Sequence, residues 1–356
     1  MEITTEGIKY AGSKLKLLPY LLQAARNLPE IHTVLDGFSG STRVSQAFAQ
    51  SGYTVTANDT AEWSFTLATC YLKADKPDGY YQKILDHLNA LPPKDGWFSA
   101  HYGGGKRDTK KPFRLKNTRK LDAIRPEIER LGLAEADKAV VLTSLLLALD
   151  RVDSTLGHFS SYLARWSARS AKDLFLTLPS RFAHGSGHTV LQKDIFDVLP
   201  RRSWDLAYFD PPYGSNNEKM PSSRVRYNAY YHFWKTVLKN DEPELFGAAG
   251  RRADSRDGKA ASVFEEFRRD ATGNFIALNA LENLIRQTRA RYVMLSYSSG
   301  GRATKENLLN CLHRQGKLVQ FLEIDYKKNI MADLRSTQTW ARDGKNYEYI
   351  FVLQKE

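Results

Sequence analysis

The sequence predicts an α/β fold in which a mostly parallel, doubly wound sheet is interrupted by a long helical insertion. Three short apolar stretches, 33–36, 53–57 and 204–209, each end in turn residues, as buried parallel strands do. A glycine-rich turn and a helix-like run from Val44 to Gln50 separate the first two stretches. Strand, loop, helix and strand in this order open a doubly wound sheet.

The rest of the chain extends this core and interrupts it. Two more strands are expected at 291–297 and 347–353. The second and third apolar stretches are separated by far more than one crossover helix, and the residues between them are mostly helical in pattern, including 120–130 and 137–149. We therefore expect a core of residues 1–61 and 186–356, an inserted helical and basic region at 62–185, and a polar mobile loop at 240–272.

The composition is that of a globular protein, because 42% of the 356 residues are hydrophobic and 26% are charged. Two cysteines, Cys70 and Cys311, give neither a disulfide framework nor a cysteine-rich zinc site, which is typical of a reducing compartment. No signal peptide is evident. The longest apolar run, 139–149, is well short of the roughly 20 residues that cross a bilayer. We expect a cytoplasmic protein without a membrane segment or a metal site.

A basic stretch from Lys106 to Lys120 carries much of the net charge of +12. Within it, eight Lys and Arg residues face one acidic residue, Asp108. Aromatic residues flank the stretch and three glycines precede it, a composition typical of a segment that follows phosphates. A solvated basic loop explains the stretch equally well when it is taken alone. The candidate contacts to a polyanion are Lys110, Lys111, Arg114 and Lys116.

The most informative residues end the third predicted strand and read Asp210-Pro211-Pro212-Tyr213. The two prolines fix φ and lack N–H groups, so this loop is stiff and offers hydrogen-bond acceptors without donors. Asp210 adds a carboxylate, and Tyr213 adds a flat ring. Two acceptors beside an aromatic face suit a planar ring that bears an exocyclic amino group, and open α/β sheets bind ligands at this edge. The alternative is a rigid strand-ending turn with a structural tyrosine.

A glycine loop, residues 36–40, follows the first strand. It lacks the three glycines of a dinucleotide fingerprint and the lysine of a phosphate loop, which indicates a nucleoside ligand without a pyrophosphate. Asp59, at the end of the second strand, is placed to accept hydrogen bonds from ribose hydroxyls. A helix N-cap is the alternative role for this aspartate.

Together these features resemble the Dam-like family of adenine-N6 DNA methyltransferases, whose catalytic motif is Asp-Pro-Pro-Tyr. The segment from Lys9 to Lys14 is similar to the family's cofactor segment, and residues 36–40 are similar to its glycine loop. Asn58-Asp59 matches the acidic end of its second strand, whereas Thr42 stands where a further glycine is common. The order of cofactor segment, glycine loop, long insertion and catalytic motif is also similar.

The resemblance implies a Rossmann-like core that uses S-adenosylmethionine to methylate a flipped-out adenine in double-stranded DNA, with target recognition in the insertion. A restriction endonuclease acting on the same site is a candidate partner. The implied catalytic residues, whose acceptors hold the adenine amino group, are Asp210, Pro211, Pro212 and Tyr213. The implied cofactor contacts are Tyr10, Lys14, Asp36, Phe38, Gly40, Asp59, Asp194 and Asp210. Further candidate phosphate contacts are Arg224 and Arg226.

Two other functions stay open. Enzymes that methylate an exocyclic nitrogen of an RNA base can carry the same tetrapeptide, and a catalytically inactive nucleic-acid-binding relative could retain the fold. The Lys9–Lys14 segment and the large insertion favour DNA, and the intact Asp210 favours catalysis. The aromatic run 227–234 is expected either to line the pocket or to fill the gap left by the flipped base, with Phe233 and Trp234 in the core.

Overall fold

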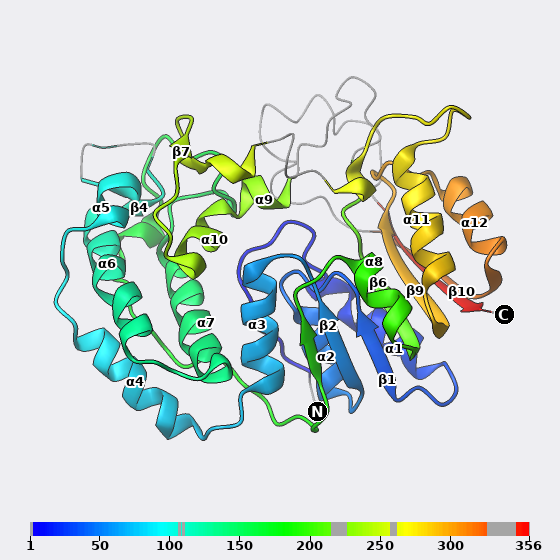
Figure 1. The fold of residues 1–356 in the computed structure, drawn as a ribbon, viewed down its shortest axis with the longest axis horizontal. Helices are drawn as coiled ribbons and strands as arrows, with labels where there is room; N and C mark the ends of the chain where they lie inside the picture. Colours follow the sequence, from blue (N-terminus) through cyan, green and yellow to red (C-terminus); the bar gives the residue numbers. More distant parts are fainter. Residues whose placement is uncertain are drawn as a thin grey trace.

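A computed structural model of the chain describes residues 3–105, 108, 111–214, 226–256, 262–325 and 347–355. They form a central sheet flanked by helices, with a mainly helical lobe beside it (Figure 1). The strand order in the sheet is β10-β11-β9-β6-β1-β2-β5. Neighbours from β9 to β5 are parallel, while β11 runs antiparallel to both β9 and β10. The predicted mixed α/β architecture with a mostly parallel sheet is thus confirmed.

The strands of this sheet are β1 (Thr33–Asp36), β2 (Thr54–Asn58), β5 (Thr189–Leu191), β6 (Trp204–Phe209), β9 (Ala290–Ser298), β10 (Gly316–Asp325) and β11 (Tyr347–Lys355). β1 and β6 have the predicted bounds, β2 is shifted by one residue, and β9 and β11 extend the predicted strands. The strands β5 and β10 were not predicted. β5 has three half-buried residues, and β10 is a half-exposed edge strand, so neither has the apolar run of a buried strand.

Helices cover both faces of the sheet. One face carries η1 (Leu15–Leu17), α1 (Leu18–Arg26), α2 (Arg43–Gln50) and part of α3 (Glu62–Lys73). The other face carries α8 (Ile195–Val198), η3 (Leu199–Arg201), α11 (Ile276–Gln287) and α12 (Lys305–His313). Val34 and Leu35 are consecutive in β1 and belong to the two different cores, as the alternation of side chains along a strand requires.

The helical lobe is built around the long buried helix α7 (Glu135–Val152). Around it lie α4 (Asp78–Ala90), α5 (Trp97–Tyr102), α6 (Leu115–Arg130), η2 (Ala168–Ala171) and the paired strands β3 (Gly103–Gly104) and β4 (Phe113–Arg114). α3 packs against α7 and against β5, so it joins the lobe to the sheet. Two helices that follow the Asp-Pro-Pro-Tyr loop, α9 (Tyr227–Tyr230) and α10 (His232–Lys239), also belong to the core of the lobe.

The described part of 240–272 differs from the expected loop. It contains the hairpin strands β7 (Leu245–Phe246) and β8 (Arg251–Arg252), followed by η4 (Ala253–Ser255) and η5 (Val263–Glu265). Arg252 is 3% exposed and donates to the carboxylate of Asp241 at 2.6 and 2.7 Å. The Tyr102 hydroxyl donates to the Gly250 carbonyl at 2.8 Å. The hairpin is therefore joined to the lobe at Gly250, and a buried arginine within it is paired with Asp241.

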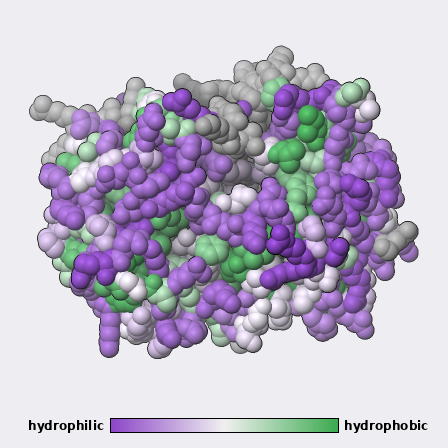
Figure 2. Space-filling view, in the orientation of Figure 1, coloured by the Kyte–Doolittle hydropathy of each residue, from purple (hydrophilic) through white to green (hydrophobic). Residues whose placement is uncertain are grey.

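The molecular surface is mainly hydrophilic on the face drawn in Figure 2. The apolar run 139–149 lies inside α7 with nearly all of its side chains buried, as a core helix should. Within the described ranges, no helix combines the length and the apolar character that a membrane span needs.

Candidate active site

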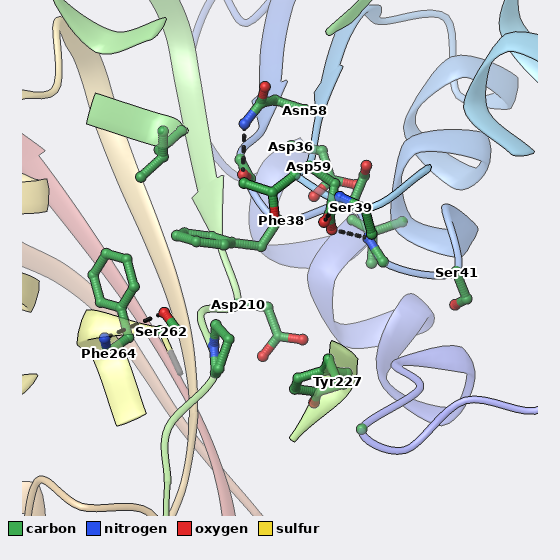
Figure 3. A pocket seen from close by; sticks show the side chains of 18 of the residues that line it. Asp36, Phe38, Ser39, Ser41, Asn58, Asp59, Asp210, Tyr227, Ser262 and Phe264 are labelled. Atoms are coloured by element: carbon green, nitrogen blue, oxygen red, sulfur yellow. Dashed lines mark hydrogen bonds between the residues drawn. The ribbon is translucent and has the colours of Figure 1, made fainter. Parts of the chain in front are cut away.

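The carboxyl ends of β1, β2 and β6 meet at one edge of the sheet and bring together Asp36, Asp59 and Asp210 (Figure 3). A cavity of about 340 Å³ opens there, within the size range of small-molecule sites. Pro212 lines this cavity, whereas Pro211 is buried behind it and Tyr213 is half-buried. The lining also contains every residue that was predicted to contact a cofactor: Tyr10, Lys14, Asp36, Phe38, Gly40, Asp59, Asp194 and Asp210.

The glycine loop after β1 packs so closely against neighbouring aromatic rings that a side chain on either of its glycines would collide with them. A Cβ on Gly37 would lie 2.6 Å from the Phe209 ring. Gly40 has a φ of +49°, and a Cβ there would lie 3.0 Å from the Tyr10 ring. Thr42 has a φ of +64°, so it adopts the left-handed conformation that favours glycine while carrying a β-branched side chain. Its hydroxyl accepts a hydrogen bond from the Gln46 amide at 2.9 Å.

Asp59 holds this loop in place. Its carboxylate accepts hydrogen bonds from the backbone N–H of Gly40 at 2.8 Å and of Ala61 at 3.0 Å. The second bond reaches Ala61, the residue before α3, but α3 has no side-chain cap, so Asp59 lines the cavity wall without being the helix N-cap. Burial raises the pKa of Asp59, and the backbone N–H groups oppose this shift. Asp194, in contrast, caps α8 through the Phe196 N–H at 2.9 Å and also lines the cavity.

Asp36 is a buried carboxyl group with one free acceptor. It is 1% exposed, and the Ser45 hydroxyl donates to its Oδ2 at 2.6 Å. Its Oδ1 has no hydrogen-bond partner among the described residues, and the same is true of Oδ1 of Asn58. Burial raises the pKa of Asp36 to about 7, with Ser45 opposing the shift. Buried acceptors without partners in a cavity wall suit the amino and hydroxyl donors of a nucleoside ligand.

Lys14 and Asp210 form a largely buried ion pair. The Lys14 Nζ lies 2.8 Å from the Asp210 Oδ1, and the two side chains are 5% and 16% exposed. Burial alone would lower the pKa of Lys14, but Asp210, together with Tyr213, Glu348 and Tyr208, outweighs this effect and raises that pKa well above its ordinary value. The Lys14 Nζ also donates to the Gly12 carbonyl at 3.3 Å and lies 5.5 Å from the centre of the Tyr213 ring. Lys14 is therefore not a solvated lysine.

The Asp-Pro-Pro-Tyr loop is fixed at its far end. The Tyr213 carbonyl accepts the Arg302 N–H at 2.7 Å, and the Tyr297 hydroxyl donates to the same carbonyl at 3.4 Å. The rings of Tyr213 and Tyr297 are in contact, with their centres 5.2 Å apart. Two strands of the sheet thus hold the loop, since Tyr297 comes from β9 and Asp210 directly follows β6.

Tyr10 contributes another wall of the cavity and joins it to the lobe. Its ring stacks on Tyr227 at 5.2 Å and on Tyr231 at 4.8 Å between ring centres. Within the aromatic run 227–234, Tyr227 and Asn228 line the cavity. The rings of Tyr230, Tyr231, Phe233 and Trp234 are buried. The run therefore lines the pocket at its start and fills the core elsewhere, so its buried rings cannot enter a DNA duplex.

The segment 262–265 belongs to the cavity wall and was not predicted as part of the site. Phe264 is 4% exposed, and its ring meets the edge of the Phe38 ring at 5.2 Å (Figure 3). Glu265 is 7% exposed, and burial raises its pKa to about 7. The aromatic Phe264 within a polar stretch is the sequence signal that points to burial, whereas its neighbour Val263 is 43% exposed.

The described residues of the basic stretch have partners within the chain. Lys116 pairs with Asp173 at 2.5 Å, and Lys111 donates to the His101 carbonyl at 2.6 Å. The Arg114 guanidinium lies 4.2 Å from the Trp166 ring centre. Arg226 directly precedes α9. Lys110 and Arg224 lie outside the described residues. The DNA contacts stay predictions, and these side chains would have to exchange partners to reach phosphates.

A comparison with family models decides the class of protein. The model of the D12 class N6 adenine-specific DNA methyltransferases matches residues 10–294, from the cofactor segment past the catalytic motif. The chain belongs to this family. The D12 class methyltransferase described here is thus an adenine-specific DNA methyltransferase, as the Asp-Pro-Pro-Tyr motif predicts.

Curated relatives agree with this assignment. Type II methyltransferase M.NlaIII of Neisseria lactamica is 27% identical over 98% of this chain and 99% of its own length. Modification methylase StsI of Streptococcus sanguinis is 25% identical over 98% of this chain and 52% of its own. Type II methyltransferase M.FokI of Planomicrobium okeanokoites is 24% identical over 98% and 53%. The D12 class methyltransferase therefore spans nearly all of the first relative and about half of the other two.

Proposed function

We propose that the chain transfers the methyl group of S-adenosylmethionine to N6 of adenine within a specific sequence of double-stranded DNA. The observation that carries this proposal is the convergence of the predicted cofactor contacts on one cavity beside Asp210. The wall includes the carboxyl groups of Asp36, Asp59, Asp194 and Asp210, which suit a cationic ligand with amino and hydroxyl donors. S-adenosylmethionine, when bound, supplies an electrophilic methyl group on a sulfonium.

The residues of the chain would act on the adenine by holding its amino group. The lone pair of this amine is delocalised into the ring, which makes it a poor nucleophile. Hydrogen bonds to the Asp210 carboxylate and the Pro211 carbonyl would favour a pyramidal nitrogen with an available lone pair, and positioning would supply much of the acceleration. Lys14 would keep Asp210 ionised, and Tyr213 would hold the face of the flipped-out base.

We further propose that the helical lobe recognises the target and that the enzyme modifies DNA for a restriction system or as a solitary methylase. The names of the relatives, type II methyltransferases and modification methylases, support this role. A partner would be an endonuclease that cuts the same site. Cys70 and Cys311 are both buried and free, which fits a reducing cytoplasm.

The experiment that tests sequence specificity expresses the chain in a host without adenine methylation and maps N6-methyladenine across the genome. We expect methylation at one short recurring sequence. Methylation scattered over unrelated adenines, or the absence of any from a host that contains the folded protein, would contradict the proposal.

Gly40→Ala should weaken S-adenosylmethionine binding by roughly tenfold, because a Cβ strains a left-handed backbone by about 1–2 kcal/mol and displaces Tyr10 from the cavity wall. Isothermal titration calorimetry measures the affinity. Gly52→Ala is the matched control, since Gly52 also has a positive φ (+91°) but nothing within 4 Å of its added Cβ. An equal loss of affinity in the two variants would show that only general strain is measured.

S-adenosylmethionine should bind more tightly as the pH rises from 5.5 to 7.5. Burial raises the pKa of Asp36 to about 7, so in the lower part of this range the folded protein binds a proton there that a cationic ligand must displace. Asp36→Asn should flatten the dependence of the dissociation constant on pH. Glu265→Gln is the comparison variant, because the pKa of Glu265 is also about 7. A slope that persists in Asp36→Asn and vanishes in Glu265→Gln would contradict this assignment.

Lys111→Gln and Arg114→Gln should each weaken binding to any DNA sequence and reduce the slope of log affinity against log salt by about one. Both side chains have partners that are weaker than an ion pair. Fluorescence anisotropy over a salt series gives the slope. Lys317→Gln is the control, because Lys317 lies on β10, at the edge of the sheet away from β5 and the lobe. If the slope of log affinity against log salt is unchanged in both variants, the basic stretch is a solvated loop that does not contact DNA phosphates.

A further inference from the structure

Glu348 lies at the same edge of the sheet as Asp210, although the two are 138 positions apart in sequence. β11 is antiparallel to β9, so β11 begins where the parallel strands end. Glu348 pairs with Ser298, the last residue of β9, while Phe209, which precedes Asp210, pairs with Leu295 of the same strand. The cofactor segment, the glycine loop and the catalytic motif do not include Glu348.

The carboxyl group of Glu348 is buried and incompletely paired. The residue is 5% exposed, and its Oε2 has no hydrogen-bond partner among the described residues. Burial raises the pKa of Glu348, with Lys14, Tyr213 and Ser298 opposing this shift and Asp210 adding to it. Burial of a carboxyl group without full pairing opposes folding, and groups of this kind are concentrated at functional sites.

Tyr213 interacts electrostatically with both Glu348 and the ion pair. The Lys14 Nζ lies 5.5 Å from the centre of the Tyr213 ring, and the Tyr213 hydroxyl lies 4.0 Å from the place of a Cβ on Gly12. The Lys14 Nζ in turn contacts Asp210 at 2.8 Å and donates to the Gly12 carbonyl. Glu348, Tyr213, Lys14 and Asp210 therefore form one cluster of electrostatically interacting groups at this edge of the sheet.

We propose that Glu348 is a positioning residue for methyl transfer, which anchors the Tyr213 hydroxyl and shares the Lys14 ammonium with Asp210. This inference rests on the proposed function, in which Tyr213 and Asp210 receive the adenine. Glu348 would then hold the Tyr213 hydroxyl, while the backbone N–H of Arg302 holds the backbone carbonyl of Tyr213. Lys14 contacts Asp210 through Oδ1, and the Glu348 carboxyl group interacts electrostatically with the same ammonium group.

The test compares Glu348→Ala and Glu348→Gln with the wild-type enzyme on a duplex that contains the mapped target sequence. We expect kcat to fall about tenfold in Glu348→Ala, because the near-attack arrangement is populated less often, while the dissociation constant for S-adenosylmethionine stays within about twofold. Glu348→Gln should recover part of kcat, since its amide can still contact the Tyr213 hydroxyl. Its rate should also persist to lower pH, because Lys14 is then left to Asp210 alone and lowers the pKa of Asp210 further.

A double-mutant cycle with Tyr213→Phe tests whether Glu348 affects kcat through the Tyr213 hydroxyl. If Glu348 acts through the Tyr213 hydroxyl, Glu348→Ala should cost little more in kcat when Tyr213→Phe is already present. Glu323→Ala is the matched control, because Glu323 lies on the neighbouring strand β10 and is paired with Lys305 at the surface. It should leave kcat unchanged.

Three results would overturn the inference while the wild-type enzyme methylates adenine. The first is a wild-type kcat in Glu348→Ala. The second is a double-mutant cycle in which the losses of kcat are fully additive, together with an unshifted pH profile in Glu348→Gln. The third is a Glu348→Ala variant that loses affinity for S-adenosylmethionine but keeps its kcat. If Glu348→Ala does not fold, as judged by circular dichroism, the Glu348→Gln profile and its cycle with Tyr213→Phe decide the question. Failure of the wild-type enzyme to methylate adenine would instead overturn the proposed function.

Discussion

Asp210→Asn is expected to lower kcat by about 10²–10³-fold or more, while DNA binding changes by no more than a few-fold. The substitution keeps the size of the side chain but replaces the charged acceptor with an amide. The amide has one acceptor oxygen, and its N–H donors face the adenine amino group and Lys14, which are themselves donors. The hydrogen bond that makes the lone pair available is then lost, whereas the surface that binds DNA is unchanged.

Single-turnover methylation and fluorescence anisotropy separate these two effects of Asp210→Asn. Asp122→Asn is the control for the loss of a buried carboxylate, because Asp122 is 6% exposed but accepts backbone N–H groups of Phe98 and Ser99 within the lobe. It should alter thermal stability and leave kcat close to the wild-type value. Parallel losses of DNA binding and of kcat in Asp210→Asn would contradict the catalytic role of Asp210.

Lys14→Met is expected to move the acid limb of the pH–rate profile to higher pH and to reduce the rate at neutral pH by roughly tenfold or more. Burial raises the pKa of Asp210, and Lys14 opposes this shift. Without the ammonium, Asp210 stays protonated to higher pH, and the protonated group offers one acceptor fewer to the adenine amine. Raising the pH should therefore restore part of the activity.

The profile of kcat against pH tests the role of Lys14, with Lys14→Arg as the variant that keeps the positive charge. Lys14→Arg should retain the wild-type acid limb even if its plateau is lower, because a guanidinium also stabilises the carboxylate. If Lys14→Met lowers the plateau without moving the limb, Lys14 acts on something other than the ionisation of Asp210.

The elements that the sequence could predict are those defined by local patterns. β1 and β6 are short apolar runs that end in turn residues, and their bounds agree with the prediction. The residues of the glycine loop and the Asp-Pro-Pro-Tyr motif line one cavity because parallel strands place their carboxyl ends at one edge. The family pattern shows that Thr42 stands where a glycine is common, but only the structure shows that its φ is +64°.

The features that escaped prediction depend on contacts between distant segments. α9 and α10 look like a continuation of the core in sequence, yet Phe233 packs inside the helical lobe against Phe113 at 4.9 Å. Arg252 reads as a loop residue until its pairing with Asp241 is seen. Glu348 interrupts an apolar strand, and nothing local indicates that it interacts electrostatically with Lys14 and Asp210. Hydrophobic pattern and turn signals carry no information on such pairings.

The most direct test of the central claim incubates the purified protein with S-adenosylmethionine tritiated in its methyl group and with genomic DNA, with total RNA in parallel. The digested products are then separated as nucleosides. The account predicts label in N6-methyldeoxyadenosine from wild-type protein and its loss in Asp210→Asn. Label that appears in RNA alone, in a methylated cytosine, or equally in Asp210→Asn would contradict it.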